Sequence, residues 1–267
     1  MSNLKAVILA AGEGIRLRPL TNEKPKAMVE LFGMTLLERQ IEVFKSCGIN
    51  DIIVITGYRD DTINFPNIKK LKNFDYDSTN MVETLFCAKD ELIDTVIVSY
   101  GDIIFEKNVL YKLLDSNDDV SVVIDSNWKK YWGERFDEPL TDAESLKLNS
   151  LDYILEIGQK VKNINEIEGQ YIGLMKFKDE GLDFIKKYYE KIKEESITSG
   201  KNPINPNLPF RKSYMTDFIE GLINNGLKVK AVTINGGWLE LDNINDYKLY
   251  NRLFQGKNLS DFIKIGN

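Results

Sequence analysis

The fold is decided by the stretch LKAVILAAGEGIRLRPLT, residues 4–21. Its first half is apolar, as in a buried strand, and we expect that strand at Ala6–Leu9. Gly12 and Gly14 follow, and glycines there let the backbone approach a phosphate closely and point N–H groups at it. Arg16 adds a planar, two-pronged donor. The stretch therefore predicts a strand followed by a phosphate-binding loop.

Two familiar glycine motifs do not fit this loop. A dinucleotide fingerprint needs a third Gly or Ala at position 17, where Leu17 stands, and a P-loop needs Gly-Lys-Ser/Thr, which is lacking. A turn that only links two elements is the plainest alternative. Against it, Arg16, Pro19, Thr21 and Lys26 stand at fixed offsets, and Lys26 brings a second positive charge. Two cations on a Gly-rich loop suffice for phosphoryl or nucleotidyl transfer, which depends on positioning and charge neutralisation.

The rest of the chain alternates strand-like and helical segments. Strands are expected at Ala6–Leu9, Ile52–Thr56, Thr95–Ser99, Val120–Ile124, Tyr171–Phe177 and Val229–Ile234. Helices are expected at Leu36–Cys47, Met81–Leu92, Gly181–Lys193 and Tyr214–Asn225. This alternation predicts an α/β fold with a mostly parallel sheet covered by helices on both faces.

One segment breaks the alternation. Residues 126–170 are rich in charge, aromatics and short polar turns, and we interpret them as an insertion or lid over the carboxyl ends of the strands, where such sheets bind ligands. We expect a single domain over residues 1–255 and a loosely docked tail over 256–267.

Composition narrows the possible functions. The 267 residues include 41 acidic and 35 basic side chains, a net charge of −6, which disfavours nucleic acid as a partner. With no histidine in the chain, catalysis would use carboxylates, Lys, Arg, backbone amides or metal. Cys47 and Cys87 lie in apolar helical patterns, and we expect them to be buried, reduced thiols. Without a signal peptide or an apolar run long enough to span a membrane, the protein is expected to be cytoplasmic and free of membrane partners.

Two aspartates are candidate ligands for Mg²⁺. Asp102 follows the strand-like run Thr95–Ser99, which places it at the carboxyl end of a central strand. Asp242 lies between another strand-like run and a helix, with Glu240 as a weaker third candidate. Hard Mg²⁺ prefers such oxygen ligands beside nucleotide phosphates. The alternative is that Asp102 is a turn residue and Asp242 a helix cap.

The loop resembles a known signature. Gly12-x-Gly14-x-Arg16-x-x-Pro19-x-Thr21, followed by Pro25–Lys26, is similar to that of the nucleotidyltransferase superfamily that makes nucleotide-sugars and CDP-activated alcohols. The resemblance implies a Rossmann-like mixed sheet of the nucleotide-diphospho-sugar transferase type. It also implies that Arg16 clamps the β- and γ-phosphates, that Lys26 stabilises charge on the α-phosphate, and that Asp102 and Asp242 hold Mg²⁺. The nucleotide-binding residues it implies are Leu9, Ala10, Ala11, Gly12, Glu13, Gly14, Tyr100 and Gly101.

The segment Asp77–Leu85 indicates to which branch of this superfamily the chain is similar. Its Thr-Asn-Met-Val-x-Thr-Leu pattern resembles the phosphocholine-cytidylyltransferase branch, so CTP is the expected nucleotide. Thr79 and Asn80 are the candidate base-binding residues, because an amide side chain can donate to and accept from the mixed edge of cytosine. Asn80 also fits an ordinary N-cap of the following helix, and the two roles can coexist.

The acceptor is expected to bind to the insertion. The segments 128–144 and 167–174 resemble a subgroup of the same branch that includes the phosphoglutamine cytidylyltransferases of capsular phosphoramidate synthesis, a likeness that does not by itself fix the acceptor. L-Glutamine phosphate is therefore our first choice, with phosphocholine and 2-aminoethylphosphonate as alternatives. The predicted acceptor-binding residues are Trp128, Trp132, Arg135, Glu168 and Tyr171. Arg135 would pair with an acceptor carboxylate and Glu168 or Glu144 with its ammonium group, whereas the two tryptophans could equally pack a helix onto the core.

Two other classes of function remain open from the sequence. A uridylyl- or thymidylyltransferase acting on a sugar 1-phosphate would share the loop and both aspartates. A catalytically silent nucleotide-binding domain would be expected to lose Lys26 or an aspartate, and all three are present. The sequence leaves open whether the chain forms a homo-oligomer.

Overall fold

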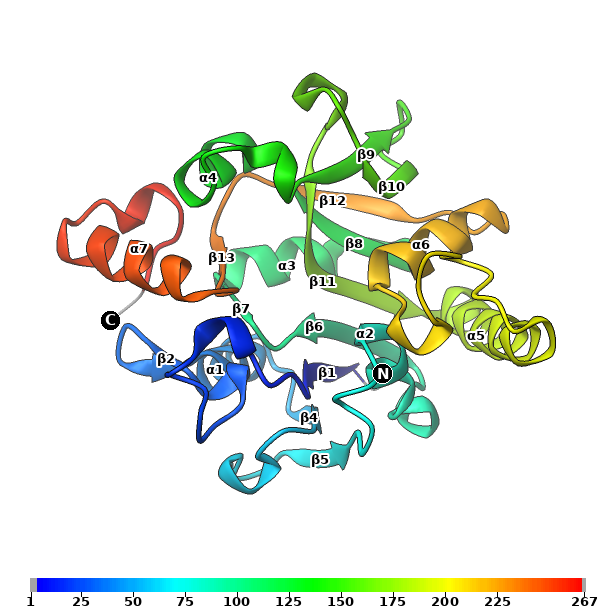
Figure 1. The fold of residues 1–267 in the computed structure, drawn as a ribbon, viewed down its shortest axis with the longest axis horizontal. Coiled ribbons are helices and arrows are strands. Elements are labelled where there is room, and N and C mark those ends of the chain that lie inside the picture. Colours follow the sequence, from blue (N-terminus) through cyan, green and yellow to red (C-terminus); the bar gives the residue numbers. More distant parts are fainter. Residues whose placement is uncertain (1–3, 266–267) are drawn as a thin grey trace.

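The computed structural model describes residues 4–265, and a seven-stranded sheet forms the centre of that part of the chain (Figure 1). The strands lie in the order β12 (Lys230–Ile234), β8 (Val120–Asp125), β11 (Gln170–Lys178), β6 (Thr95–Tyr100), β1 (Leu4–Ala10), β4 (Asp51–Thr56) and β5 (Lys69–Lys72). Strand β11 is antiparallel to both neighbours, and the other adjacent pairs are parallel. The predicted α/β fold with a mixed, mostly parallel sheet is confirmed.

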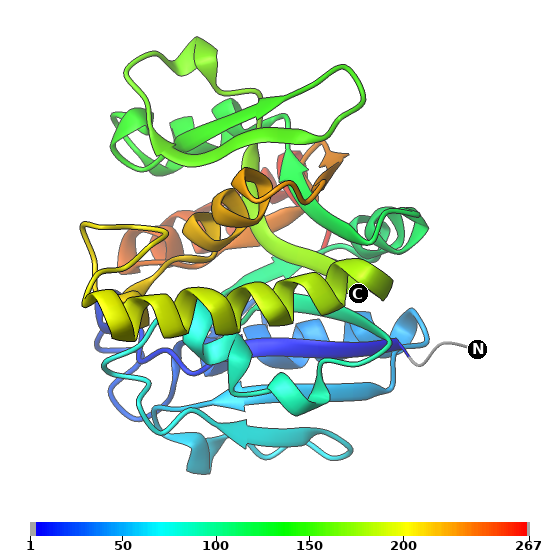
Figure 2. The same ribbon diagram turned by 90° about the vertical axis from the view of Figure 1, so that its right-hand side faces the viewer.

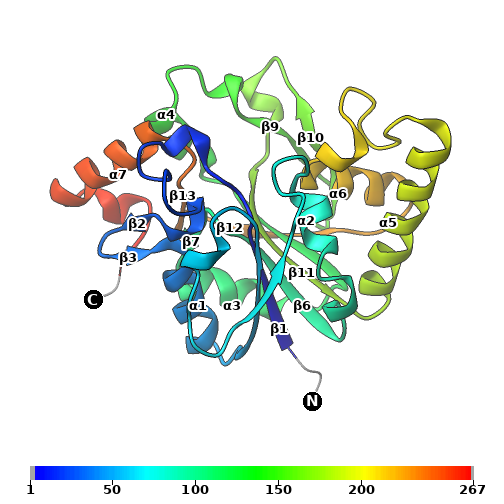
Figure 3. The same ribbon diagram turned by 60° about the horizontal axis from the view of Figure 1, so that its bottom comes forward.

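Helices cover both faces of the sheet, as Figure 3 shows. Alternate residues of β1 face opposite sides: Ala6 and Ile8 pack into one core, and Val7 and Leu9 into the other. The first core includes residues of α1 (Leu36–Ser46), α3 (Lys107–Asp115), α4 (Trp128–Arg135) and α7 (Ile244–Gln255). The second includes residues of α2 (Met81–Phe86), α5 (Asp179–Ser199) and α6 (Met215–Asn224).

Three two-stranded pairs extend from this core. They are β2 (Glu30–Leu31) with β3 (Met34–Thr35), β7 (Ile103–Phe105) with β13 (Trp238–Glu240), and β9 (Glu144–Leu148) with β10 (Ile154–Lys160). The β9–β10 hairpin and α4 make up most of the segment interpreted as an insertion. This segment lies at the end of the molecule opposite β5 (Figure 2).

Two expectations about burial need correction. The tail is not loosely docked over its described residues, because Leu259, Phe262 and Ile263 are buried in the core and the Gly237 N–H donates to the carbonyl of Phe262. Residues 266–267 of the tail, and 1–3 of the predicted domain, lie outside the described residues. The cysteines are free, as expected, but Cys87 is exposed and Cys47 half-buried.

Candidate active site

The carboxyl ends of the parallel strands supply the Gly-rich loop and Asp102. β1 ends at Ala10, directly before the loop, and β6 ends at Tyr100, two residues before Asp102. The loop closes on itself: the Lys26 N–H donates to the Gly12 carbonyl at 3.2 Å, and the Thr21 hydroxyl to the Gly14 carbonyl at 2.8 Å. Parallel strands thus deliver the two predicted groups to one edge of the sheet.

Gly14 is required by geometry. It has φ +70°, a conformation that L side chains rarely adopt, and a Cβ there would lie 2.9 Å from the Cβ of Lys26. The absence of a side chain at Gly14 lets Lys26 pack against the loop.

The pairing of β7 with β13 brings the two aspartates together. Glu240 pairs with Ile103, and the Leu241 N–H donates to the Asp102 carbonyl at 2.9 Å. Two segments about 140 residues apart in the chain therefore place Asp102 and Asp242 at one point.

Lys26 lies between these carboxylates. Its Nζ is 2.8 Å from Asp102 Oδ2 and 2.9 Å from Asp242 Oδ1. Burial alone would favour the neutral amine, but the charges of Asp102 and Asp242 raise the pKa of Lys26 above its ordinary value. Burial would likewise raise the pKa of Asp242, but Lys26 and Arg16 hold it below the usual range. Lys26 and Asp242 are therefore both charged at neutral pH.

Arg16 contacts the same aspartate from the solvent side. Its Nη2 lies 2.5 Å from Asp242 Oδ1, and its side chain is 71% exposed. A long cation with one end on the site and most of its surface in solvent is free to contact an incoming polyanion. Arg18, two residues further along the loop, pairs instead with Glu13.

The carboxylate pair fits a divalent ion bound together with a phosphate. Asp102 Oδ1 is buried and has no hydrogen-bond partner within the described residues, which leaves a hard oxygen available as a ligand. Among residues 4–265 no three His, Cys, Asp or Glu side chains are arranged to hold a metal by themselves. A metal here would need further oxygens from water or substrate, as Mg²⁺ at nucleotide sites does.

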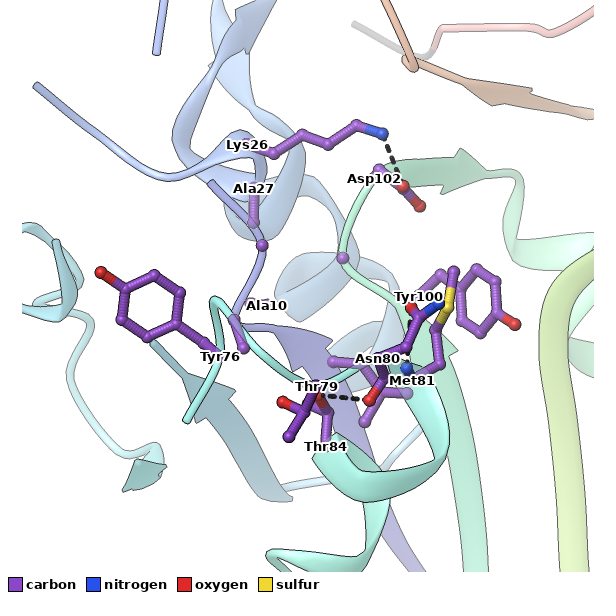
Figure 4. A pocket seen from close by; sticks show the side chains of 14 residues that line it. Ala10, Lys26, Ala27, Tyr76, Thr79, Asn80, Met81, Thr84, Tyr100 and Asp102 are labelled. Carbon is purple, nitrogen blue, oxygen red and sulfur yellow. Dashed lines mark hydrogen bonds and ion pairs between the residues drawn. The ribbon is translucent and has the colours of Figure 1, made fainter. Parts of the chain in front are cut away.

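A narrow slot beside Lys26 and Asp102 has a volume of about 130 Å³ (Figure 4). Most predicted nucleotide-binding residues line it: Leu9, Ala10, Ala11, Gly12, Thr79, Asn80, Tyr100 and Gly101. The prediction did not include Tyr76, Met81 and Thr84, which also line it.

The polar groups of Asn80 are used within the protein. Its Oδ1 accepts from the Met81 N–H at 2.9 Å, as the cap of α2, and its Nδ2 donates to the Lys212 carbonyl at 3.3 Å. The expected capping role of Asn80 is therefore present. Its contact with cytosine stays a prediction.

A larger cavity of about 830 Å³ adjoins the slot. Glu13, Gly14, Arg16, Asp242 and Glu240 line it, as do Trp132 and Tyr171 of the predicted acceptor set. Tyr171 is the second residue of the antiparallel strand β11, whose bulge contains Gly173 at φ +82°. A Cβ at Gly173 would lie 2.5 Å from the ring of Tyr100, so this glycine allows Tyr100 and Tyr171 to pack edge to face.

Trp128, Arg135 and Glu168 do not line either cavity. Trp128 is 1% exposed and packs edge to face on Trp132, which matches the structural alternative for the tryptophan pair. Glu168 is exposed, and its carboxylate accepts from the Leu148 N–H.

The structure differs from the prediction that Arg135 binds an acceptor carboxylate. Its side chain has no exposed surface and pairs with Glu240 at 2.8 Å and with Asp246 at 3.1 Å. Because protein carboxylates already occupy its guanidinium, the structure does not support an acceptor-binding role.

Two carboxylates of the insertion lie in the cavity instead. Asp142 accepts from the indole N–H of Trp132 at 3.0 Å, and Glu144 begins β9. Burial raises the pKa of Glu144 to about 7. Arg16 and Lys26 are the only cations lining this cavity in the described part of the chain. Carboxylates therefore outnumber cations in the lining of this cavity, a property that the sequence alone did not reveal.

This fold and site define a nucleotidyltransferase, and the comparisons agree. The model for the MobA-like NTP transferase domain matches residues 6–153, and the chain belongs to that family. The chain is 39% identical over 257 residues to the CTP:phosphoglutamine cytidylyltransferase of Campylobacter jejuni subsp. jejuni serotype O:2, covering 92% of this chain and 98% of that protein. The predicted family and enzyme class are confirmed.

Two further matches, one in sequence and one in structure, are also with cytidylyltransferases. The choline-phosphate cytidylyltransferase of Streptococcus pneumoniae is 37% identical over 107 residues, which cover 39% of this chain and 47% of that protein. The solved structure of the CTP:phosphocholine cytidylyltransferase from Streptococcus pneumoniae superposes with a TM-score of 0.69 at 24% identity, covering 94% of this chain and 99% of that one. This structural likeness supports the fold. No helix among residues 4–265 combines the length and apolar character needed to cross a membrane.

Proposed function

We propose that this enzyme is a cytidylyltransferase that joins CTP to a small phosphorylated metabolite, first of all L-glutamine phosphate, and releases pyrophosphate. The proposal depends chiefly on the position of Lys26 and Asp102, which line both the narrow slot and the larger cavity. A nucleotide in the slot and an acceptor in the cavity would meet at these two groups. The choice of CTP and of phosphoglutamine follows the relative that matches almost the whole chain.

In the proposed reaction an oxygen of the acceptor phosphate attacks the α-phosphorus of CTP. The new P–O bond forms as the bond from that phosphorus to the oxygen bridging the α- and β-phosphates breaks, and pyrophosphate leaves with the bonding electrons. No general base is needed, because a phosphate oxygen is already ionised at neutral pH. The chain's main contributions are orientation and neutralisation of charge.

Lys26 and Arg16 are the cations proposed to act on the triphosphate. The Lys26 ammonium, fixed between two carboxylates, is close enough to the slot to stabilise charge that builds on the α-phosphate. Arg16 is exposed and reaches the β- and γ-phosphates with its planar fork. Asp102 and Asp242 would hold Mg²⁺, which supplies further positive charge to the phosphates.

The acceptor would bind against the insertion, which we propose acts as the lid of a single domain. Asp142 and Glu144 could receive its ammonium group, because they are the carboxylates that the insertion contributes to the cavity. Phosphocholine is the second candidate, since Trp132, Tyr171 and nearby carboxylates also suit a quaternary ammonium. The product would be a CDP-linked precursor for the capsule or cell surface, made in the cytoplasm without nucleic-acid or membrane partners.

A substrate matrix tests the proposal. The purified enzyme would be given each of CTP, UTP, dTTP and ATP with phosphoglutamine, phosphocholine, 2-aminoethylphosphonate or a sugar 1-phosphate. Pyrophosphate release and product mass would be measured. The expected result is the highest kcat/KM for CTP with phosphoglutamine and a product of the mass of CDP-glutamine. Faster turnover of phosphocholine would favour the second candidate, and preference for UTP or dTTP with a sugar phosphate would refute cytidylyl transfer.

A further inference from the structure

Arg135 connects the insertion to the segment that carries Asp242. It is the last residue of α4, which packs against α7, and its side chain is fully buried. Nη1 donates to Glu240 Oε2 at 2.8 Å, while Nε and Nη2 donate to the two oxygens of Asp246 at 3.1 and 3.2 Å. One guanidinium thus holds two carboxylates that flank Asp242 in the sequence.

Asp246 passes this restraint to Asp242. Its Oδ2 accepts from the backbone N–H of Asp242 at 2.9 Å and from that of Asn243 at 3.1 Å. Asp246 is 1% exposed, so solvent cannot readily substitute for these bonds. The carboxylate of Asp246 therefore fixes the backbone at Asp242, and Arg135 in turn fixes this carboxylate by a bidentate ion pair.

The surroundings of Arg135 favour arginine over lysine. Its guanidinium carbon lies 5.2 Å from the ring centre of Tyr131 and 5.4 Å from that of Trp132, both on the same helix. Lysine would keep the charge but lose both the planar fork and the stacking surface.

We propose that Arg135 is a positioning residue for metal binding, which acts on Asp242 through Asp246 and Glu240 and does not touch the acceptor. The inference depends on the proposed function in its assignment of Asp242 as a metal ligand. Residues that orient a metal ligand commonly affect metal affinity by about 10–100-fold. Through Arg135, the insertion that borders the larger cavity also sets the geometry of Asp242, a carboxylate that lines the same cavity.

The test compares Arg135→Lys with wild type. The affinity for Mn²⁺ in the complex with CTP would be measured by electron paramagnetic resonance, alongside the KM values for CTP and acceptor and the Tm. We expect Arg135→Lys to weaken Mn²⁺ binding by about tenfold or more, with the KM for the acceptor nearly unchanged. A lower Tm with unaltered Mn²⁺ affinity would show a merely structural role and overturn the proposal. A raised acceptor KM with intact Mn²⁺ binding would overturn it in favour of acceptor recognition.

Three further variants complete the design. Lys130→Gln removes an exposed ion pair from the same helix to Asp261 and should leave Mn²⁺ affinity unchanged. Asp246→Asn weakens the ion pair with Arg135 by changing the carboxylate partner. It should weaken Mn²⁺ binding, and it keeps the proposal testable if Arg135→Lys fails to fold. Asp242→Asn tests the underlying assignment. If it leaves Mn²⁺ affinity intact, the proposed metal site fails. If it abolishes binding while Arg135→Lys and Asp246→Asn do not alter it, only the present inference fails.

Discussion

Lys26 Nζ lies 2.9 Å from Asp242 Oδ1 although 216 residues separate the two in sequence. The same ammonium is 2.8 Å from Asp102 Oδ2. A largely buried cation between two carboxylates offsets their mutual repulsion. Lys26 therefore has two roles in the proposed enzyme, as counter-ion of the carboxylates and as the positive charge nearest the slot.

Replacing Lys26 by Met should separate these roles. We expect kcat to fall by about 10²-fold or more, with a smaller change in the KM for CTP, because the lost charge acts mainly in the transition state. The variant should also be less stable than wild type, since Asp102 and Asp242 lose their shared cation. Divalent metal should restore its Tm more than it raises that of wild type. Steady-state kinetics and thermal unfolding with and without Mg²⁺ measure these effects. Lys24→Met, in the same loop, is the matched control, and an unchanged kcat in Lys26→Met would exclude a catalytic role.

The two aspartates should be separately essential. Asp102→Asn and Asp242→Asn keep size and shape but remove the charge that a metal needs, so each should lower kcat by at least about 10²-fold. Circular dichroism should show a native fold in both. EDTA should stop the wild-type reaction, and Mg²⁺ should restore it. Near-normal turnover of either variant in Mg²⁺ would remove that residue from the metal site.

Much of the architecture followed from local sequence patterns. Both ends of β1 and of β6 lie within two residues of the predicted bounds. A short apolar run flanked by turn residues is typical of a buried strand, so the sequence pattern alone predicts these strands. Asp102 was correctly placed at a strand end for the same reason. Its proximity to Asp242 was inferred only from the resemblance, because it depends on the β7–β13 pairing, a long-range contact without a local signal.

Side-chain direction was the harder problem. The sequence shows that Arg135 lies near aromatic residues and carboxylates, but not that the end of α4 turns it towards Glu240 and Asp246. Of the two suggested ammonium partners, Glu144 begins β9 and lines the cavity, whereas Glu168 lies beyond the β9–β10 hairpin and accepts from the Leu148 N–H. Such choices are set by tertiary packing, which the one-dimensional pattern does not encode.

Gly14→Ala tests how closely the loop must approach Lys26. The new Cβ would lie 2.9 Å from Lys26 Cβ at a residue with positive φ, so we expect a loss of about 1–2 kcal/mol in stability. The displaced ammonium should also lower kcat by roughly tenfold to a hundredfold. Gly133→Ala is the control, because a Cβ at that exposed position in α4 meets nothing within 4 Å. That substitution should stabilise the helix slightly. Equal effects of the two substitutions on kcat would contradict the requirement for glycine at position 14.

Glu144 should give the free enzyme a measurable pH dependence of stability. Burial raises its pKa from an ordinary 4.5 to about 7, with the nearby carboxylates of Asp217 and Asp142 adding to the rise and a hydrogen bond with Thr216 opposing it. Between these pH values the folded state holds a proton that the unfolded state has lost, so this residue's contribution to stability falls as pH rises from about 4.5 to 7 and is constant above. Glu144→Gln cannot ionise and should remove that fall. The free energy of unfolding by urea would be measured from pH 5 to 8. The difference between Glu144→Gln and wild type should increase in favour of the variant up to about pH 7 and then stay constant.

Glu134→Gln, at an exposed position of α4, is the control and should follow the wild-type curve. Other groups that titrate in this range are common to all three proteins and largely cancel in the differences. Parallel curves for wild type and Glu144→Gln would show that the Glu144 carboxylate is already ionised at pH 5, whereas the expected divergence would identify it as a group that an acceptor's ammonium could hold in its charged form.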